Sequence, residues 1–353
     1  MPTSNDKPLT IRDIARLAHV SYQTVSLVIN GKPGVSDKTR REIMRLMEEH
    51  DFRPNRAAQM LTTQRSKTLE LIVVDVNYGG RLADSTKQMV RVAKEAGYSL
   101  LISEATAQNL ETALESAGSR MVEGVVLYAP RLRVPDETLT AWSRGIPVVR
   151  RDYVPSSRLA WVGFDQVFAS RIAVEHLLEL GHTQIASVPP EADLHNGYWR
   201  HITIQQSLRE HGLELVAYAE GDYSMGSGYA GVQEILATGK PFTALIVGTD
   251  NMALGALRAL REAGLRVPDD VSVISFDNSE LSQYTEPPLT TVEFKFSKQD
   301  EIAVKFLLEL IADPTIELHH RVLSPTLIER ASTRALTSKH RSSRASAKKG
   351  EDS

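Results

Sequence analysis

Apolar positions in the first fifty residues recur at intervals of three and four, the spacing of helices that each bury one face. Three such faces follow one another, with inward positions Ile11, Ile14, Ala15 and Ala18, then Val25, Val28 and Ile29, then Ile43, Leu46 and Met47. Ser21 and Ser36 stand at the N-cap positions of the second and third helices. The pattern predicts three short helices, the first two forming a helix-turn-helix.

From Leu69 onward the pattern changes to continuous apolar runs that alternate with helical stretches. The runs are 69–76, 99–103, 124–129, 146–150, 160–164, 184–188, 243–247 and 271–276. Continuous rather than alternating apolar strands indicate parallel sheets covered on both faces. The predicted fold is therefore an all-α helix-turn-helix head followed by an α/β body with two doubly wound parallel-sheet lobes.

Composition supports a globular protein and excludes some classes. The 353 residues are 42% hydrophobic and include no cysteine, which excludes disulfides and thiolate metal sites. Charges interrupt the first twenty residues, and no apolar run has the length of a membrane span, so we expect a cytoplasmic protein.

Charge is distributed unevenly along the chain. Residues 1–66 hold 11 basic and 7 acidic side chains, residues 67–336 hold 25 and 35, and residues 337–353 hold 5 and 2. A basic head on an acidic body suits a nucleic-acid module joined to a part that does not touch phosphate, although a difference of this size also arises by chance.

The second predicted helix has an outward face of small polar residues. In a helix-turn-helix this helix lies in the major groove of DNA, where its N-terminal half meets base edges. Tyr22, Gln23, and Ser26 or Leu27 are the outward candidates. The alternative is an ordinary solvated helix face.

Residues 10–64, and above all 20–26, closely resemble the DNA-binding head of the lactose-repressor (LacI) family. The resemblance implies that Tyr22 and Gln23 read bases. It also implies that the phosphate backbone is approached by Ser21, Asn30, Ser36 and Thr39. Leu27 departs from the family member that residues 20–26 match, in which an arginine at this position reads a guanine.

The segment 53–66 resembles the family's hinge, which joins the head at 1–52 to the body at 67–336. The resemblance implies a short helix that orders on DNA, with Asn55, Arg56, Ala58 and Gln59 in the minor groove and Leu61 as a wedge between base steps. Two hinges pair, which requires a homodimer. A flexible linker is the alternative.

The body also resembles this family, whose effector domain is similar to periplasmic sugar-binding proteins. Residues 174–186, 220–229, 250–278 and 287–292 carry the likeness, which runs from about 9 to 333. It implies an N-lobe at about 67–164 and 293–323 and a C-lobe at about 165–292 and 324–336. The chain is expected to cross between them near 164/165, 292/293 and 323/324. The basic tail, 337–353, lacks leucine heptads and is expected to be disordered.

Candidate effector residues follow the predicted strands, because such sheets bind ligands beyond their carboxyl ends. Asp152 and Asp277 each follow a strand, and Arg200 opens a helix running toward His211, so together they suit sugar hydroxyls. The family match adds Asp75, Tyr128, Trp199, Tyr223, Thr249, Phe294 and Phe296. Aromatic side chains replace amides at several of these positions, which points to a sugar or glycoside with more apolar faces than galactose. The alternative is that the two aspartates cap helices or form interlobe salt bridges.

Other patterns carry less weight. Residues 226–231 fit G-x-G-x-x-G with Asp250 downstream, but no apolar strand immediately precedes them, so nicotinamide binding is not expected. The histidines lack metal-ligand spacing and no G-x-S-x-G elbow occurs, so we expect neither metal, cofactor nor catalysis.

The sequence thus predicts a homodimeric transcriptional regulator, a repressor of carbohydrate-utilisation genes that binds a pseudo-palindromic operator and responds to a sugar-like effector. Two alternatives stay open, a regulator that uses a purine or other metabolite as co-repressor and a sugar-binding protein without DNA activity. The effector, and the choice between induction and co-repression, are not set by the sequence.

Overall fold

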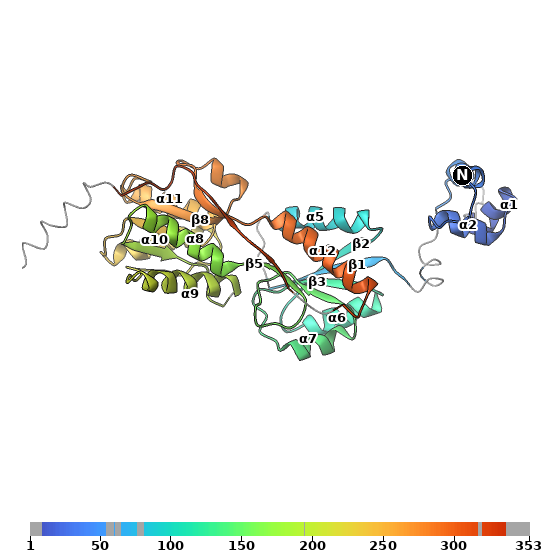
Figure 1. Ribbon diagram of the computed structural model, residues 1–353, viewed down its shortest axis with the longest axis horizontal. Coiled ribbons are helices and arrows are strands. Elements are labelled where there is room, and N and C mark those ends of the chain that lie inside the picture. The colour runs from blue at the N-terminus through green and yellow to red at the C-terminus, as the bar shows by residue number, and fades with distance from the viewer. Residues whose placement is uncertain are drawn as a thin grey trace, which may run out of the picture. The chain divides into compact units, whose positions relative to one another are not determined.

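The computed structural model describes residues 9–53, 60, 65–75, 81–193, 195–316 and 320–336, with the backbone only at 81–84 (Figure 1). The chain divides into two compact units, Met1–Ser66 and Lys67–Ser353. Each unit is described by itself below. The expected disordered tail, 337–353, lies outside the described residues, as does most of the hinge.

The first unit is built from three short helices, α1 (Ile11–Leu17), α2 (Tyr22–Ile29) and α3 (Asp37–Glu49). Their shared core contains Ile14, Val25 and Ile43, all with no exposed surface. Ser21 caps α2 by accepting a hydrogen bond from the backbone N–H of Thr24 at 3.1 Å. The predicted helix-turn-helix is confirmed, with both inward faces packed as the periodicity indicates.

The second unit contains two sheets. The first has the order β10-β5-β4-β3-β1-β2 and is parallel throughout, and the second has the order β11-β9-β8-β7-β6. The strands of the first sheet are β1 (Thr68–Val74), β2 (Ser99–Ala105), β3 (Gly124–Tyr128), β4 (Val148–Arg150), β5 (Trp161–Phe164) and β10 (His320–Leu323). Those of the second are β6 (Ile185–Val188), β7 (Ala244–Val247), β8 (Ser272–Asp277), β9 (Thr290–Glu293) and β11 (Thr326–Ile328).

Helices cover both sheets and complete two lobes (Figure 1). The helices of the first lobe are α5 (Arg81–Glu95), α6 (Leu110–Ser119), α7 (Asp136–Ser143) and α12 (Phe296–Ala312). Those of the second are α8 (Gln166–Glu179), α9 (His195–Glu210), α10 (Met225–Ala237) and α11 (Asp250–Glu262), with a 3-10 turn η1 (Glu280–Gln283). The chain changes lobe between β5 and α8, between β9 and α12, and between β10 and β11.

The eight apolar runs all form strands, which confirms the predicted pair of doubly wound lobes, with three local differences. Edge strand β11 runs antiparallel to β9, because the chain re-enters the second sheet directly from the first. Strand β2 pairs with only one other strand of the described residues, and Leu101 and Ile102 are 40% and 45% exposed despite their apolar run. Helix α9 begins at His195, so Arg200 lies in its second turn rather than opening it.

Gly228, within the segment that imitates a dinucleotide motif, has a packing role together with Gly255. A Cβ on Gly228 would lie 1.9 Å from the carbonyl oxygen of Met252, and a Cβ on Gly255 would lie 1.8 Å from that of Met225. Helices α10 and α11 can therefore approach this closely only because glycine stands at both positions.

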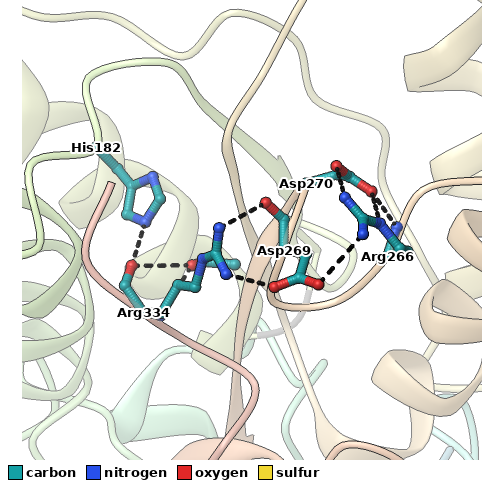
Figure 2. Close-up of polar contacts among 6 residues, drawn as sticks. His182, Arg266, Asp269, Asp270 and Arg334 are labelled. Atoms are coloured by element: carbon teal, nitrogen blue, oxygen red, sulfur yellow. Dashed lines mark hydrogen bonds and ion pairs between the residues drawn. The ribbon is translucent and has the colours of Figure 1, made fainter. Parts of the chain in front are cut away.

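The last described residues are fastened to the second lobe by an ion cluster (Figure 2). The Arg334 guanidinium pairs with Asp269, and Arg266 pairs with Asp270 at 2.8 Å. His182 Nε2 lies 3.0 Å from the Arg334 carbonyl oxygen. These contacts hold the segment 331–336 against the second lobe. Among the described residues, no helix is long and apolar enough to cross a membrane.

Candidate functional site

Helix α2 presents the side chains that the sequence assigns to DNA. Tyr22 is 44% exposed and Gln23 is exposed, whereas Ser26 and Leu27 are partly buried. Asn30 Nδ2 donates to the Ser26 carbonyl at 2.8 Å and to its hydroxyl at 3.3 Å, which closes the end of the helix. The exposed N-terminal half of α2 is thus carried on a packed three-helix core.

The remaining predicted DNA contacts divide into two groups. Ser36 caps α3 through the backbone N–H of Thr39 at 3.3 Å, so both side chains lie at an exposed helix N-terminus suited to phosphate. The hinge positions Asn55, Arg56, Ala58, Gln59 and Leu61 lie outside the described residues.

At the end of the first lobe's sheet, Asp152 follows β4 and is 2% exposed. Its Oδ2 accepts a hydrogen bond from the backbone N–H of Ala129 at 3.1 Å, while Oδ1 has no hydrogen-bond partner in the described part of the chain. Burial raises the pKa of this carboxyl to about 6, against the opposing charges of Arg150 and Arg151. Tyr128 lies at the end of neighbouring β3, and the Arg151 guanidinium carbon is 5.1 Å from its ring centroid.

In the second lobe, Arg200 is 3% exposed and firmly positioned. Its Nε donates to Gln166 Oε1 at 2.9 Å, and its Nη1 donates to the Gly248 carbonyl. The guanidinium lies 4.8 Å from the ring centroid of Phe276 and 4.9 Å from that of Phe294. Phe294 itself is only 3% exposed, so it supports Arg200 from within the aromatic core.

Asp277 ends β8 with a φ of 116°, a strained conformation for a residue other than glycine. The following turn is held by Asp250, which accepts hydrogen bonds from the hydroxyl of Thr291 at 2.8 Å and the backbone N–H of Ser279 at 2.6 Å. Burial, and then the charge of Asp277, raise the pKa of Asp250. The buried Asp250 carboxylate therefore positions the turn that carries Asp277.

The other second-lobe candidates differ in their surroundings. Thr249 caps α11 by accepting from the backbone N–H of Met252 at 3.1 Å, so its hydroxyl is engaged in the fold. Tyr223 is partly buried with a φ of 71°. Phe296 is partly buried, and its ring meets that of Phe164 edge-on at 5.4 Å.

The first turns of α9 contact the opposite lobe. Trp199 meets the ring of Tyr153, from the β4–β5 connection, edge-on at 6.1 Å. The backbone N–H of His195 donates to the carbonyl of Pro130 at 3.0 Å. The carboxyl ends of β3 and β4 therefore lie beside the start of α9, which brings Trp199 close to the Asp152 side of the junction.

Arg131 adds a charged contact between the lobes. Its guanidinium pairs with Glu191 and, at 2.9 Å, with Asp193. Its Nη1 also donates to the Asp75 carbonyl at 3.3 Å, while the Asp75 carboxylate accepts from the backbone N–H of Ala107 at 2.7 Å. Asp75 thus holds its own loop and also binds Arg131. Because Arg131 links the two lobes, we call it the latch residue.

Several functional candidates are visible only in three dimensions. Asp250 stood out in the sequence only as the acid of an apparent dinucleotide motif, and Gln166 only as the start of a helix. Arg131 and His195 gave no signal, since their partners lie about sixty residues away in the sequence.

A helix-turn-helix unit and a two-lobed body with buried polar groups at the ends of both sheets define a DNA-binding transcriptional regulator with an effector-binding domain. Residues 10–55 match the model of bacterial regulatory proteins of the lacI family, and residues 174–333 match that of a periplasmic binding protein-like domain. The chain belongs to the LacI family.

Relatives cover almost the whole chain. The lactose operon repressor of Escherichia coli strain K12 is 31% identical over 346 residues, which are 96% of this chain and 94% of the relative. The transcriptional repressor PurR of Erwinia tasmaniensis is 32% identical, covering 92% and 96%. The crystal structure of the lac repressor dimer bound to operator and the anti-inducer ONPF matches with a TM-score of 0.84 at 30% identity, covering 93% of this chain and 100% of that chain. These relatives are transcriptional regulators.

Proposed function

We propose that the protein is a homodimeric repressor of carbohydrate-utilisation genes whose operator affinity is controlled by a sugar or glycoside bound between the lobes of its body. The observation that carries this proposal is the set of buried polar groups at the sheet ends. Asp152 keeps an acceptor oxygen without a hydrogen-bond partner, and Arg200 and Asp277 are held in place by buried neighbours. Acceptors and donors of this kind suit adjacent hydroxyls.

The ring systems beside these groups favour a ligand with apolar faces. Trp199 and Tyr153 lie edge-on to one another at the lobe junction. A sugar ring presents C–H groups on its faces and hydroxyls at its rim, so aromatic faces and carboxylates bind complementary parts of it. We assign this region a binding role and no reaction.

The proposed base-reading residues are Tyr22, Gln23, Ser26 and Leu27, with Ser21, Asn30, Ser36 and Thr39 near phosphates. Exposure of the first turn of α2 supports this assignment, because base edges are reached by the N-terminal half of such a helix. The hinge residues Asn55, Arg56, Ala58, Gln59 and Leu61 are proposed to enter the minor groove.

Dimer formation is proposed through the open edge of the first sheet. Strand β2 has a free edge, where Leu101 and Ile102 are exposed, and Val90 on neighbouring α5 is 41% exposed. An apolar edge strand is a liability unless it is covered, and a second copy of the chain would cover it. Two heads then match a pseudo-palindromic operator.

Effector control follows from the two lobes. A ligand that prefers one relative orientation of the lobes stabilises it by its difference in affinity for the two states. In a dimer this changes the separation of the two hinges, and a coupling of about 1 to 3 kcal/mol alters operator affinity roughly 5- to 150-fold.

Operator gel shifts with the full chain and with residues 1–66 deleted test the DNA assignment, and the full chain is also titrated with a panel of sugars and purines. We expect loss of operator binding on deletion and a response to a sugar. Unchanged affinity after deletion would refute the assignment of the head. A response to purines alone would establish a different co-repressor.

A further inference from the structure

Arg150 is a buried cation whose charge no described residue pairs with. It is the last residue of β4 and is 2% exposed. Among the described residues, its Nε and Nη2 atoms have no hydrogen-bond partner and no ion pair includes it. Arginine cannot deprotonate in a protein, and a buried charge without a partner is strongly unfavourable.

The backbone of Arg150 is held in the sheet. The Arg150 N–H donates to the Ala160 carbonyl at 2.8 Å, and the residue pairs with Leu127 of β3 and Trp161 of β5. The next residue, Arg151, belongs to the opposite face and binds Asp300 and Ser85 there. Arg150 is thus fixed at the carboxyl end of a central strand, without the partners that satisfy its neighbour.

The charges that act on His195, across the junction from Arg150, are those of two arginines. Burial, followed by the charges of Arg150 and Arg133, lowers the pKa of His195 to about 4, so this imidazole is neutral at physiological pH. His195 Nδ1 and Asn196 Oδ1 also have no hydrogen-bond partner among the residues that the structure describes. Polar atoms of both lobes are therefore unsatisfied at the same junction.

Asp152 does not satisfy Arg150. Its carboxylate accepts from Ala129, and the described ion pairs do not join it to the guanidinium. Its remaining oxygen requires a donor such as a hydroxyl, whereas Arg150 requires an acceptor. Nε and Nη2 form one edge of the guanidinium fork, the edge that binds two oxygens of a carboxylate or phosphate together.

We propose that Arg150 binds an anionic group of the effector, so that the ligand is a sugar carrying a phosphate ester or a carboxylate. This inference rests on the proposed function, because it places the ligand at the same interlobe site. Asp152 then takes a hydroxyl of the same molecule, and Arg150 selects against neutral sugars.

Calorimetric titration of the full chain with matched probes tests the proposal. The probes are glucose, glucose 6-phosphate and glucuronate, the corresponding galactose series, and inorganic phosphate. We expect the wild type to prefer a charged sugar to its neutral counterpart. Arg150→Gln is expected to weaken the charged probe about 30-fold or more while the neutral sugar changes little. The phosphate and carboxylate arms distinguish the two kinds of anion.

Two controls keep the result interpretable. Arg209→Gln makes the same substitution at an exposed position on α9 and should leave binding unchanged. Arg150→Gln removes a buried unpaired charge, so its melting temperature without ligand should equal or exceed that of the wild type.

Two results overturn the proposal: a neutral sugar that binds as tightly as its charged counterparts to both proteins, and the absence of binding by any charged probe at millimolar concentration. Gel shifts with the bound probe separate this inference from the proposed function. Binding that depends on Arg150 but leaves operator affinity unchanged would refute the proposed regulation and keep the anion site. Operator release by a neutral sugar would refute the anion site and keep the proposed regulation.

Discussion

Replacing Asp152 by asparagine is expected to stabilise the protein while weakening effector binding. The carboxylate is 2% exposed, and its pKa is raised from 3.8 to about 6, chiefly by burial. The folded state therefore binds the proton more tightly than the unfolded state, which means that ionised Asp152 opposes folding. The amide keeps the shape and the hydrogen bond from Ala129 without the charge.

The magnitude follows from the shift in pKa. A shift of roughly two units corresponds to about 3 kcal/mol, at about 1.4 kcal/mol per unit. The penalty is absent below pH 3.8, grows as the pH rises from 3.8 to about 6, and is complete above that value. Asp152→Asn should therefore be more stable than the wild type by up to about 3 kcal/mol near pH 8, with little difference near pH 4.

Urea unfolding of both proteins at the two pH values measures this difference. Glu234→Gln, at an exposed position on α10, is the control for loss of a solvated carboxylate. Affinity for the responding sugar should fall about tenfold or more, because a charged acceptor is lost. The reasoning is refuted if the variant is less stable than the wild type by the same amount at both pH values. Asp152 would then be a structural anchor.

Three further substitutions test separate parts of the molecule. Leu27→Arg should change the operator selected from a random pool at the base under this residue, since arginine pairs with guanine for about 1 to 3 kcal/mol and leucine cannot; an identical preferred sequence would mean that Leu27 does not face the bases. Arg131→Gln removes partly exposed interlobe ion pairs worth up to about 1 kcal/mol each, so effector affinity should fall roughly tenfold by calorimetry; unchanged affinity would contradict a latch. Arg151→Met leaves Asp300 buried and unpaired, so unfolding free energy should fall by about 3 to 5 kcal/mol, with most of it recovered when Asp300→Leu is added; a loss below about 1 kcal/mol would refute that estimate.

The fold was predictable because its determinants are local. The eight strands β1 to β8 coincide with the eight apolar runs, whereas β9, β10 and β11 match none of them, and Ser21 and Ser36 cap the helices whose starts they predict. The exposure of Leu101 could not be predicted, because an edge strand and a central strand have the same apolar composition.

The candidate site was only partly visible in the sequence. Asp152 and Asp277 could be named because they end apolar strands, a feature that the sequence displays. The surroundings of Phe294 and the unpaired state of Arg150 depend on which side chains meet after the chain has crossed between lobes. Contacts between side chains far apart in the sequence leave no periodic pattern in it. Charged groups without a partner can therefore be recognised only in the folded structure.

The three crossings between lobes have a consequence for how the protein is made. Helix α12 and strand β10 belong to the first lobe, yet the ribosome adds them after all but one strand of the second. Phe306 and Leu307 of α12 fill the same core as Leu69 and Leu71 of β1, so the first lobe stays open while the intervening chain is synthesised. The head, whose contacts are all local, completes its core much earlier. A nascent chain therefore completes its DNA-binding unit before it completes the effector-binding body. Stopping translation ahead of α12 would yield a folded DNA-binding unit without a complete effector-binding body.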